Sequence, residues 1–316
     1  MKFSVIIPLY NKAPYVAKAI KSVLAQSFTD YELVIMDDGS QDDSFEIAVN
    51  AIQGCGKCHV YRQKNSGVSM ARNNAVAISQ GRYLCFLDAD DWWAPTFLEK
   101  MSSLIEGFPE AGIYGSNYTI MNETRHKTRV ASVGVDKGFE KGYINYCQVY
   151  AKTMYMPLWT GAVCIPRVVF EEMRGFPKGI KLGEDFMLWV RIALKYKVVF
   201  LNESLSYYNQ DADLHHRGVG ILNVPKYHML WNLRELEDVE KTDADFKALI
   251  DKLRLFHMYP YLLEREYREL ALQELAKVDW RKQPLKYRIK YYLPAPFLRI
   301  GRIVVDMGHK LKNRTN

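Results

Sequence analysis

Residues 83–91 read YLCFLDADD and join a run of apolar residues to three carboxylates. The apolar part, residues 83–87, is typical of an interior strand in a parallel sheet. Charge at the end of a buried strand is costly to desolvate unless donors or a metal ion meet it. Asp88 and Asp90 form an Asp-X-Asp sequence, which offers hard oxygen ligands to Mg²⁺ or Mn²⁺ and leaves coordination positions for a diphosphate. The alternative is an aspartate-rich turn that caps a helix starting near Pro95.

The chain before this stretch alternates between strand-like apolar runs and segments with helical spacing. We expect strands at residues 3–7, 31–36, 59–62 and 83–87. Helices are expected between them, for example where Phe45, Ala48, Val49 and Ile52 recur at helical spacing. Such alternation predicts an α/β fold, with a Rossmann-like, mostly parallel sheet sandwiched by helices.

A polar loop follows each expected strand. These loops begin at Pro8, Asp37, Asn65 and Asp88. Because right-handed crossovers place the carboxyl ends of parallel strands at one edge of the sheet, we expect the loops to converge there. The pattern therefore predicts a ligand site at that edge.

The rest of the chain is less regular. We expect strands at 113–117 and 159–165, a hairpin or mobile loop over the polar segment 123–137, and a helix that opens at Glu184 and Asp185. Beyond residue 220 the pattern is helical and charged, with no further glycine before Gly301. We therefore expect a domain boundary near residue 220.

The positive charge of the chain is concentrated at its C-terminal end. The 316 residues are 48% hydrophobic, as in ordinary globular proteins, and carry a formal charge of +7. From Trp280 onward there are ten basic residues and one acidic residue, a charge of +9, which leaves −2 for the remainder. The basic character thus belongs to the tail, and this argues against a nucleic-acid-binding core.

The cysteines and the apolar runs bear on location. Five cysteines without regular spacing suggest reduced thiols and no disulfide framework. Residues 55–59 match the haem-attachment pattern C-x-x-C-H, but they lie between an expected helix and an expected strand. The N-terminal apolar run is interpreted as a first strand and not as a signal peptide, and no run reaches the length of a membrane span. We expect a cytoplasmic protein.

Six sequence elements resemble, in order and spacing, those of family 2 glycosyltransferases of the GT-A fold. They are VIIPLYN (5–11), SVLAQSF (22–28), DDGS (37–40), GVSMARN (67–73), DADD (88–91) and ED (184–185). The resemblance covers roughly residues 3–210. Each element alone is weak, but six in one order are hard to obtain by chance.

The resemblance implies a nucleotide site that includes Pro8, Tyr10, Asn11, Asp38 and Arg72. In it, Tyr10 would lie against the base, Asp38 would hydrogen-bond the base, and Arg72 would sit near the base and the diphosphate. A base needs a flat partner and a polar group that reads its edge, and Tyr10 with Asp38 offers both. The alternative for Tyr10 is an aromatic residue that only packs, and for Asp38 it is a turn residue ahead of Gly39. For Arg72 the alternative is a solvated surface arginine.

The resemblance also implies a metal site and a catalytic base. Asp88 would face the ribose and the metal, Asp90 would ligate Mn²⁺ or Mg²⁺, and Asp185 would take the proton of the acceptor hydroxyl. Capping of its own helix is the alternative role for Asp185. Glu184 is the other candidate for the base, or a residue of the acceptor side.

His215, His216 and Arg217 are candidates for a lid or for the acceptor side, although histidines in a polar loop are more often simply exposed. The Gln-x-x-Arg-Trp element of the processive members is missing after residue 185, as are their membrane spans. We therefore expect transfer of one sugar per encounter.

The basic tail contains a second signal. Residues 297–311 form an amphipathic pattern with a broad apolar face, and Tyr287, Tyr291 and Tyr292 alternate with basic residues before it. This combination suits an anionic lipid surface. A helix docked on the catalytic domain is the alternative.

Together, these features predict a metal-dependent glycosyltransferase of polysaccharide biosynthesis, and the resemblance implies that it inverts the configuration of the transferred sugar. It would move a sugar from a nucleotide donor, with a UDP-sugar expected, to a hydroxyl of a glycan or lipid-linked glycan. We expect a catalytic domain over 1–220, with a nucleotide-sugar half at about 1–117 and an acceptor half at about 118–220, and a helical extension over 221–316. The rivals are a sugar-phosphate nucleotidyltransferase, for which no early glycine-rich loop is seen, and a non-catalytic scaffold at the membrane surface.

Overall fold

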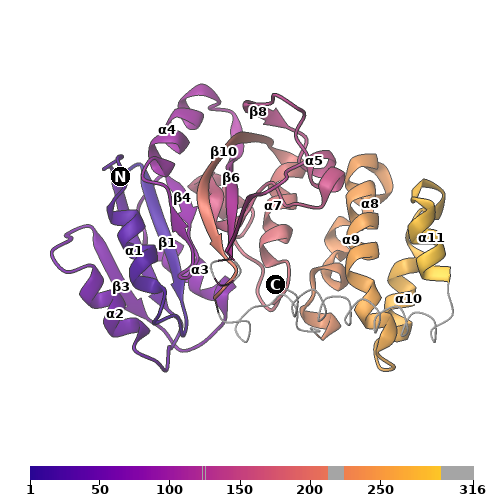
Figure 1. Ribbon diagram of the computed structural model, residues 1–316, viewed down its shortest axis with the longest axis horizontal. Coiled ribbons are helices and arrows are strands. Elements are labelled where there is room, and N and C mark those ends of the chain that lie inside the picture. Colours follow the sequence, from indigo (N-terminus) through magenta and orange to yellow (C-terminus); the bar gives the residue numbers. More distant parts are fainter. Residues whose placement is uncertain (123, 125, 213–223, 293–316) are drawn as a thin grey trace. The chain divides into compact units, whose positions relative to one another are not determined.

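The computed structural model describes the chain except for residues 123, 125, 213–223 and 293–316 (Figure 1). It contains two compact units, Met1–Met229 and Leu230–Asn316. The boundary that we expected near residue 220 falls inside the segment that is not described. The two units are taken in turn.

The first unit is built on one sheet, whose strand order is β3-β2-β1-β4-β9-β6-β10-β5. Its first half contains β1 (Phe3–Leu9), β2 (Tyr31–Asp37), β3 (Cys58–Arg62) and β4 (Tyr83–Phe86). These strands pair in parallel, with β1 between β2 and β4. The alternation in the sequence therefore predicted this half of the sheet correctly.

Helices cover both faces of this parallel half. They are α1 (Val16–Leu24), α2 (Ser44–Ala51), α3 (Val68–Ile78) and α4 (Phe97–Gly107). Val5 and Ile7 of β1 join one core cluster with residues of α1 and α4, whereas α3 packs against β1 and β2. Because successive strand residues point to opposite faces, a strand that is covered on both sides is apolar throughout.

The second half of the sheet is mixed. Its strands are β5 (Trp92–Trp93), β6 (Ala111–Asn122), β7 (Lys127–Val130), β8 (Lys141–Ile144), β9 (Val163–Pro166) and β10 (Lys197–Asn209). Strand β9 lies antiparallel between β4 and β6, and β10 runs parallel to β6. The helices are α5 (Tyr146–Thr153), α6 (Arg167–Glu172) and α7 (Glu184–Lys195).

Two expectations for this half need comment. The polar segment 123–137 contains β7, which pairs antiparallel with β6 and so forms the expected hairpin. The strand expected at 159–165 is shorter, because Thr160–Ala162 forms a 3₁₀ turn and β9 begins only at Val163. In that turn Thr160 donates to Asp185 and the Gly161 carbonyl accepts from Trp93, so both are engaged outside a strand ladder.

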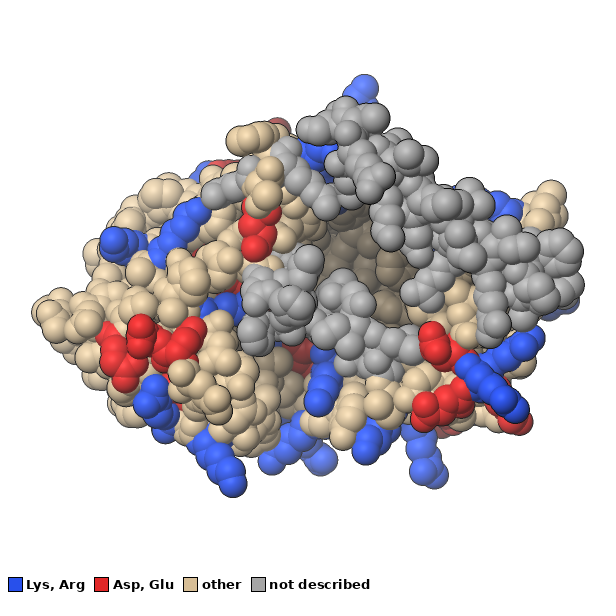
Figure 2. Space-filling view, turned by 60° about the horizontal axis from the view of Figure 1, so that its bottom comes forward, with Lys and Arg blue, Asp and Glu red and all other residues tan. Residues whose placement is uncertain are grey.

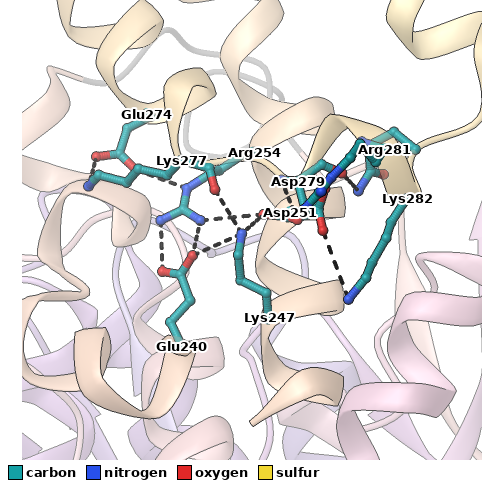
Figure 3. A network of polar contacts seen from close by, with 10 residues as sticks. Glu240, Lys247, Asp251, Arg254, Glu274, Lys277, Asp279, Arg281 and Lys282 are labelled. Carbon is teal, nitrogen blue, oxygen red and sulfur yellow. Dashed lines mark hydrogen bonds and ion pairs between the residues drawn. The ribbon is translucent and has the colours of Figure 1, made fainter. Parts of the chain in front are cut away.

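The second unit is helical in its described part. Its elements are the 3₁₀ turns Arg234–Leu236 and Trp280–Lys282 and the helices α8 (Glu237–Thr242), α9 (Ala244–Leu263), α10 (Arg268–Ala276) and α11 (Leu285–Tyr292). Figure 3 shows the ion-pair network that joins α8, α9, α10 and the turn at 280–282. Arg254 of α9 is buried and contacts Glu240 of α8 and Glu274 of α10. A charge buried this way is tolerated because both carboxylates meet it.

On the face drawn in Figure 2, lysine and arginine side chains stand out from the surface, and acidic side chains form a few small groups. In the part of the chain that the structure describes, no helix is both long and apolar enough to cross a membrane.

The expectation that all cysteines are free is wrong for one pair. Cys55 and Cys58 form a disulfide between α2 and β3, while Cys85, Cys147 and Cys164 are buried free thiols. The turn that leads into β3 brings the two Cα atoms to 5.4 Å, a separation that a disulfide spans. The expectation of reduced thiols therefore holds only for Cys85, Cys147 and Cys164.

Candidate active site

The loops after β1 and β2 meet at the carboxyl edge of the sheet, as predicted. The Asn11 amide donates to Ser40 Oγ at 3.0 Å, and Asn11 Oδ1 accepts from the Gln41 amide at 2.8 Å. Asn11 has a φ of 50°, a left-handed conformation that asparagine tolerates better than most residues. Its observed role is to join the two loops. Pro8 lies within β1 and is buried, whereas Tyr10 stays partly exposed.

Asp38 organises the third loop. It is 3% exposed, and its Oδ1 accepts from Gln63 Nε2 at 2.7 Å and from the Ser66 amide at 2.8 Å. Its Oδ2 accepts from the Gly67 amide at 2.8 Å. Both carboxylate oxygens are thus occupied by the segment that leads into α3, the helix that carries Arg72.

Arg72 connects the two acidic motifs. It is 3% exposed, so it is not a solvated surface arginine. One guanidinium nitrogen lies 2.7 Å from Asp88 Oδ1 and the other lies 3.0 Å from Glu184 Oε1. Burial lowers the pKa of Arg72, but the Asp88 and Glu184 carboxylates outweigh burial and raise it. The arginine therefore stays charged and ties the end of β4 to the start of α7.

The remaining aspartates of residues 88–91 have different surroundings. Lys12 Nζ lies 2.6 Å from Asp90 Oδ2. Asp91 is buried and accepts from the Asn209 amide at 2.9 Å and from Trp159 Nε1 at 3.4 Å. Burial, followed by the charges of Asp90 and Asp88, raises the pKa of Asp91 well above its usual range. Asp91 therefore anchors the motif to β10.

Glu184 and Asp185 open α7, and Gly183 precedes them as the N-cap. Asp185 is therefore not the N-cap residue, but it satisfies one of the free first-turn amides of its own helix, as the capping alternative proposed. Asp185 Oδ2 accepts from Thr160 Oγ1 at 3.1 Å, and Oδ1 accepts from the Phe186 amide at 2.7 Å. Burial raises the pKa of Asp185. Burial and then the Asp185 charge raise the pKa of Glu184 to about 7, against the lowering effect of Arg72.

Sequence reasoning missed three residues of this arrangement: Lys12, Trp159 and Thr160. Their partners Asp90, Asp91 and Asp185 lie 78, 68 and 25 residues away in the sequence, so no local pattern reveals the contacts. The expected lid residues His215, His216 and Arg217 lie outside the described residues. Nor do the described residues contain a group of three or more His, Cys, Asp or Glu side chains placed to hold a metal ion.

Comparison with known proteins gives a consistent picture. Residues 4–159 match the family described as glycosyl transferase family 2. An uncharacterized glycosyltransferase of Rickettsia felis is 30% identical over 232 residues, covering 72% of this chain and 37% of the relative. The glycosyltransferase GlyA of Streptococcus pneumoniae is 33% identical over 215 residues, covering 66% of this chain and 30% of the relative. The chain thus spans about a third of the length of these relatives.

Solved structures share the fold. The crystal structure of S. aureus TarS 1–349 in complex with UDP-GlcNAc superposes with a TM-score of 0.58 at 18% identity, covering 88% of this chain and 71% of that chain. The complex of the same protein with UDP gives a TM-score of 0.56, with 88% of each chain covered. At this identity the likeness shows the fold alone, and that fold is the GT-A fold expected from the sequence.

Proposed function

Because this chain belongs to the family 2 glycosyltransferases, we propose that it transfers one sugar, with inversion, from a UDP-sugar to a hydroxyl of a glycan or lipid-linked glycan in polysaccharide biosynthesis. The observation that carries the proposal is Arg72, which joins Asp88 to Glu184 beside Asp185. Arg72 thereby brings the motif of Asp88 and Asp90, which would hold the metal ion of a metal–diphosphate, next to Glu184 and Asp185, one of which would act as the base.

The donor would bind at the carboxyl ends of β1, β2 and β4, mainly to residues before about 117. Tyr10 would stack on the base, while Asp38 would shape the loop at 63–67 and so set the base pocket indirectly. Arg72 and Lys12 supply positive charge for the diphosphate. The choice of a UDP-sugar is supported by S. aureus TarS, whose structures hold UDP-GlcNAc and UDP.

A divalent ion, Mn²⁺ or Mg²⁺, would be held by Asp88 and Asp90. Arg72 and Lys12 contact one oxygen of each carboxylate, so each carboxylate has a second hard oxygen to offer. The donor's phosphate oxygens would have to complete the coordination, since the described residues form no larger ligand cluster. When bound, the ion would act as a Lewis acid on the diphosphate leaving group.

Asp185 would be the base. Its raised pKa makes it a better proton acceptor than an ordinary aspartate, and Thr160 holds one of its oxygens in place. Glu184 is engaged with Arg72 and has a pKa of about 7, so it would be partly protonated at neutral pH. We therefore propose that Asp185 accepts the proton of the acceptor hydroxyl and that Glu184 has a supporting electrostatic role.

Two matched variants test this assignment. Asp185→Asn keeps the shape of the side chain but cannot accept the proton, so turnover should fall by at least about a hundredfold while UDP-sugar affinity barely changes. Glu184→Gln should be the milder change. Transfer is followed as UDP release from UDP-hexoses with glycan acceptors, and affinity by calorimetry. Near-normal turnover of the Asp185 variant, with collapse of the Glu184 variant, would transfer the role to Glu184.

We further propose that the basic tail holds the enzyme at the cytoplasmic face of a membrane, near a lipid-linked acceptor. The support is its sequence, since residues 293–316 lie outside the described residues. A truncation should end at Tyr292, because the Tyr291 hydroxyl donates to the Leu255 carbonyl and the Tyr291 ring lies 5.8 Å from that of Trp280.

That truncation removes five of the ten basic residues of the tail together with its amphipathic segment, so it should weaken sedimentation with anionic phosphatidylglycerol vesicles at low salt and leave UDP affinity unchanged. A full-length protein that stays in the supernatant under these conditions would refute the membrane role and favour the docked helix.

A further inference from the structure

Trp159 stands at the centre of an aromatic group beside the catalytic residues. Its ring stacks on Tyr118 of β6, with centroids 5.4 Å apart and an interplanar angle of 26°. It also meets Tyr208 of β10 at 4.4 Å. Tyr118 is buried, whereas Trp159 remains partly exposed. The indole is therefore supported from within the protein and still reaches the surface.

Trp159 is also linked to both acidic motifs. Its indole nitrogen lies 3.4 Å from Asp91 Oδ2, and Asp91 directly follows Asp90. The next residue, Thr160, donates to Asp185. Trp159 thus contacts the acidic motif at Asp91 directly and is joined to Asp185 through the next residue of the chain.

The geometry of any single displacement restricts what can occupy this place. The transferred sugar is bonded to the diphosphate on one side and is attacked on the other by the hydroxyl whose proton Asp185 accepts. It must therefore lie between the carboxylates of Asp90 and Asp185. One face of a pyranose is lined by C–H groups that carry slight positive charge, which complements the negative face of an aromatic ring. Binding sites commonly combine such an aromatic wall with a few placed polar groups.

We infer that the ring of Trp159 is the platform on which the donor's sugar packs. This inference rests on the proposed function. Asp91 sets the plane of the indole through its nitrogen, and Tyr118 and Tyr208 support it. Trp159 is therefore a specificity-determining residue for the sugar and contributes nothing to the nucleotide.

The test compares affinities for UDP and for UDP-hexoses, including UDP-GlcNAc, by calorimetry. The sugar ratio, defined as the dissociation constant of UDP divided by that of the UDP-hexose, isolates the contribution of the sugar to binding. Trp159→Leu keeps an apolar side chain and removes the π face, so the ratio should fall roughly threefold to tenfold while UDP affinity is unchanged. Trp159→Phe should retain most of the ratio.

Trp92→Leu is the matched control. Trp92 is also partly exposed and stacks on a β10 tyrosine, with its ring 5.5 Å from that of Tyr207 at an angle of 11°. Tyr207 and Tyr208 are successive strand residues and therefore point to opposite faces of the sheet. Trp92→Leu should leave the sugar ratio unchanged. Its melting temperature shows how much stability is lost when a stacked tryptophan is removed.

The inference is overturned if Trp159→Leu keeps the wild-type ratio, or if it weakens UDP and UDP-hexose binding equally along with a lower melting temperature, which would mark a packing residue. It is also overturned if the wild type binds UDP and every UDP-hexose equally. A wild-type protein that binds neither UDP nor its sugars counts instead against the proposed function.

Discussion

Lys12 Nζ and Asp90 Oδ2 lie 2.6 Å apart, and the two side chains are only 14% and 17% exposed. The lysine comes from the loop after β1 and the aspartate from the loop after β4, so the pair links neighbouring strands of the sheet. A metal ion at the other oxygen of Asp90 would share the carboxylate with this ammonium and be repelled by its charge.

Replacing Lys12 with methionine should therefore have opposite effects on the binding of Mn²⁺ and on the binding of UDP. Mn²⁺ alone should bind more tightly, by roughly tenfold, because a charged hydrogen bond no longer competes for Asp90. UDP without metal should bind more weakly, because a positive charge near the diphosphate is lost. Calorimetric titrations of Mn²⁺ alone and of UDP alone measure both effects, and unchanged values for both would contradict this role of Lys12.

Asp90→Asn should abolish the metal dependence of UDP binding while the protein stays folded. The change removes an anionic oxygen ligand and nearly conserves volume. UDP affinity is compared with and without Mn²⁺. Asp43→Asn is the control, since Asp43 is an exposed aspartate whose side chain makes no capping hydrogen bond. Manganese-dependent affinity that survives in the Asp90 variant would refute the assignment of the metal.

The pH dependence of stability should reveal Glu184. Burial and the Asp185 charge raise its pKa to about 7 in the folded protein, whereas an unfolded glutamate titrates near roughly 4.3. As pH rises between these values, the unfolded chain loses the proton first, so this residue makes the free energy of unfolding fall, by on the order of 1 kcal/mol per pH unit.

Glu184→Gln cannot titrate and lacks this contribution. Its stability relative to the wild type should therefore improve steadily from about pH 5 to about pH 7. Urea denaturation at three pH values in this window measures the difference. Parallel profiles for the two proteins would show that Glu184 does not titrate there.

Arg72→Met should destabilise the protein by about 3–5 kcal/mol, because it leaves Asp88 and Glu184 at a mostly buried site without their cation. The pKa of Glu184 should rise further, since Arg72 lowers it. Lys152→Met is the control, because the Lys152–Asp136 pair is exposed and its loss should barely move the unfolding midpoint. Equal effects of the two substitutions would contradict the bridging role of Arg72.

The parallel half of the sheet was predictable because its signals are local. The apolar runs at 3–7 and 83–87 report burial on both faces, and each is followed within a few residues by the polar loop that forms the edge of the site. The strand expected at 159–165 was only partly right, for the opposite reason. Its first residues form a turn whose contacts are made with Trp93 and Asp185, and an apolar run does not reveal such contacts.

The residue types of the site are already present in the linear order of the chain. The acids at 88–91 stand out by their chemistry at the end of an apolar run, and the resemblance to family 2 glycosyltransferases points to Arg72 and to the acids at 184–185. Their protonation and pairing are properties of the folded chain alone. Arg72 contacts Glu184, which is 112 residues away, and Lys12 contacts Asp90, which is 78 residues away. The pKa of Glu184 is raised by its burial and by the charge of Asp185. Desolvation and charge–charge energies act over a few ångströms in space, and distance along the sequence does not encode which groups come that close.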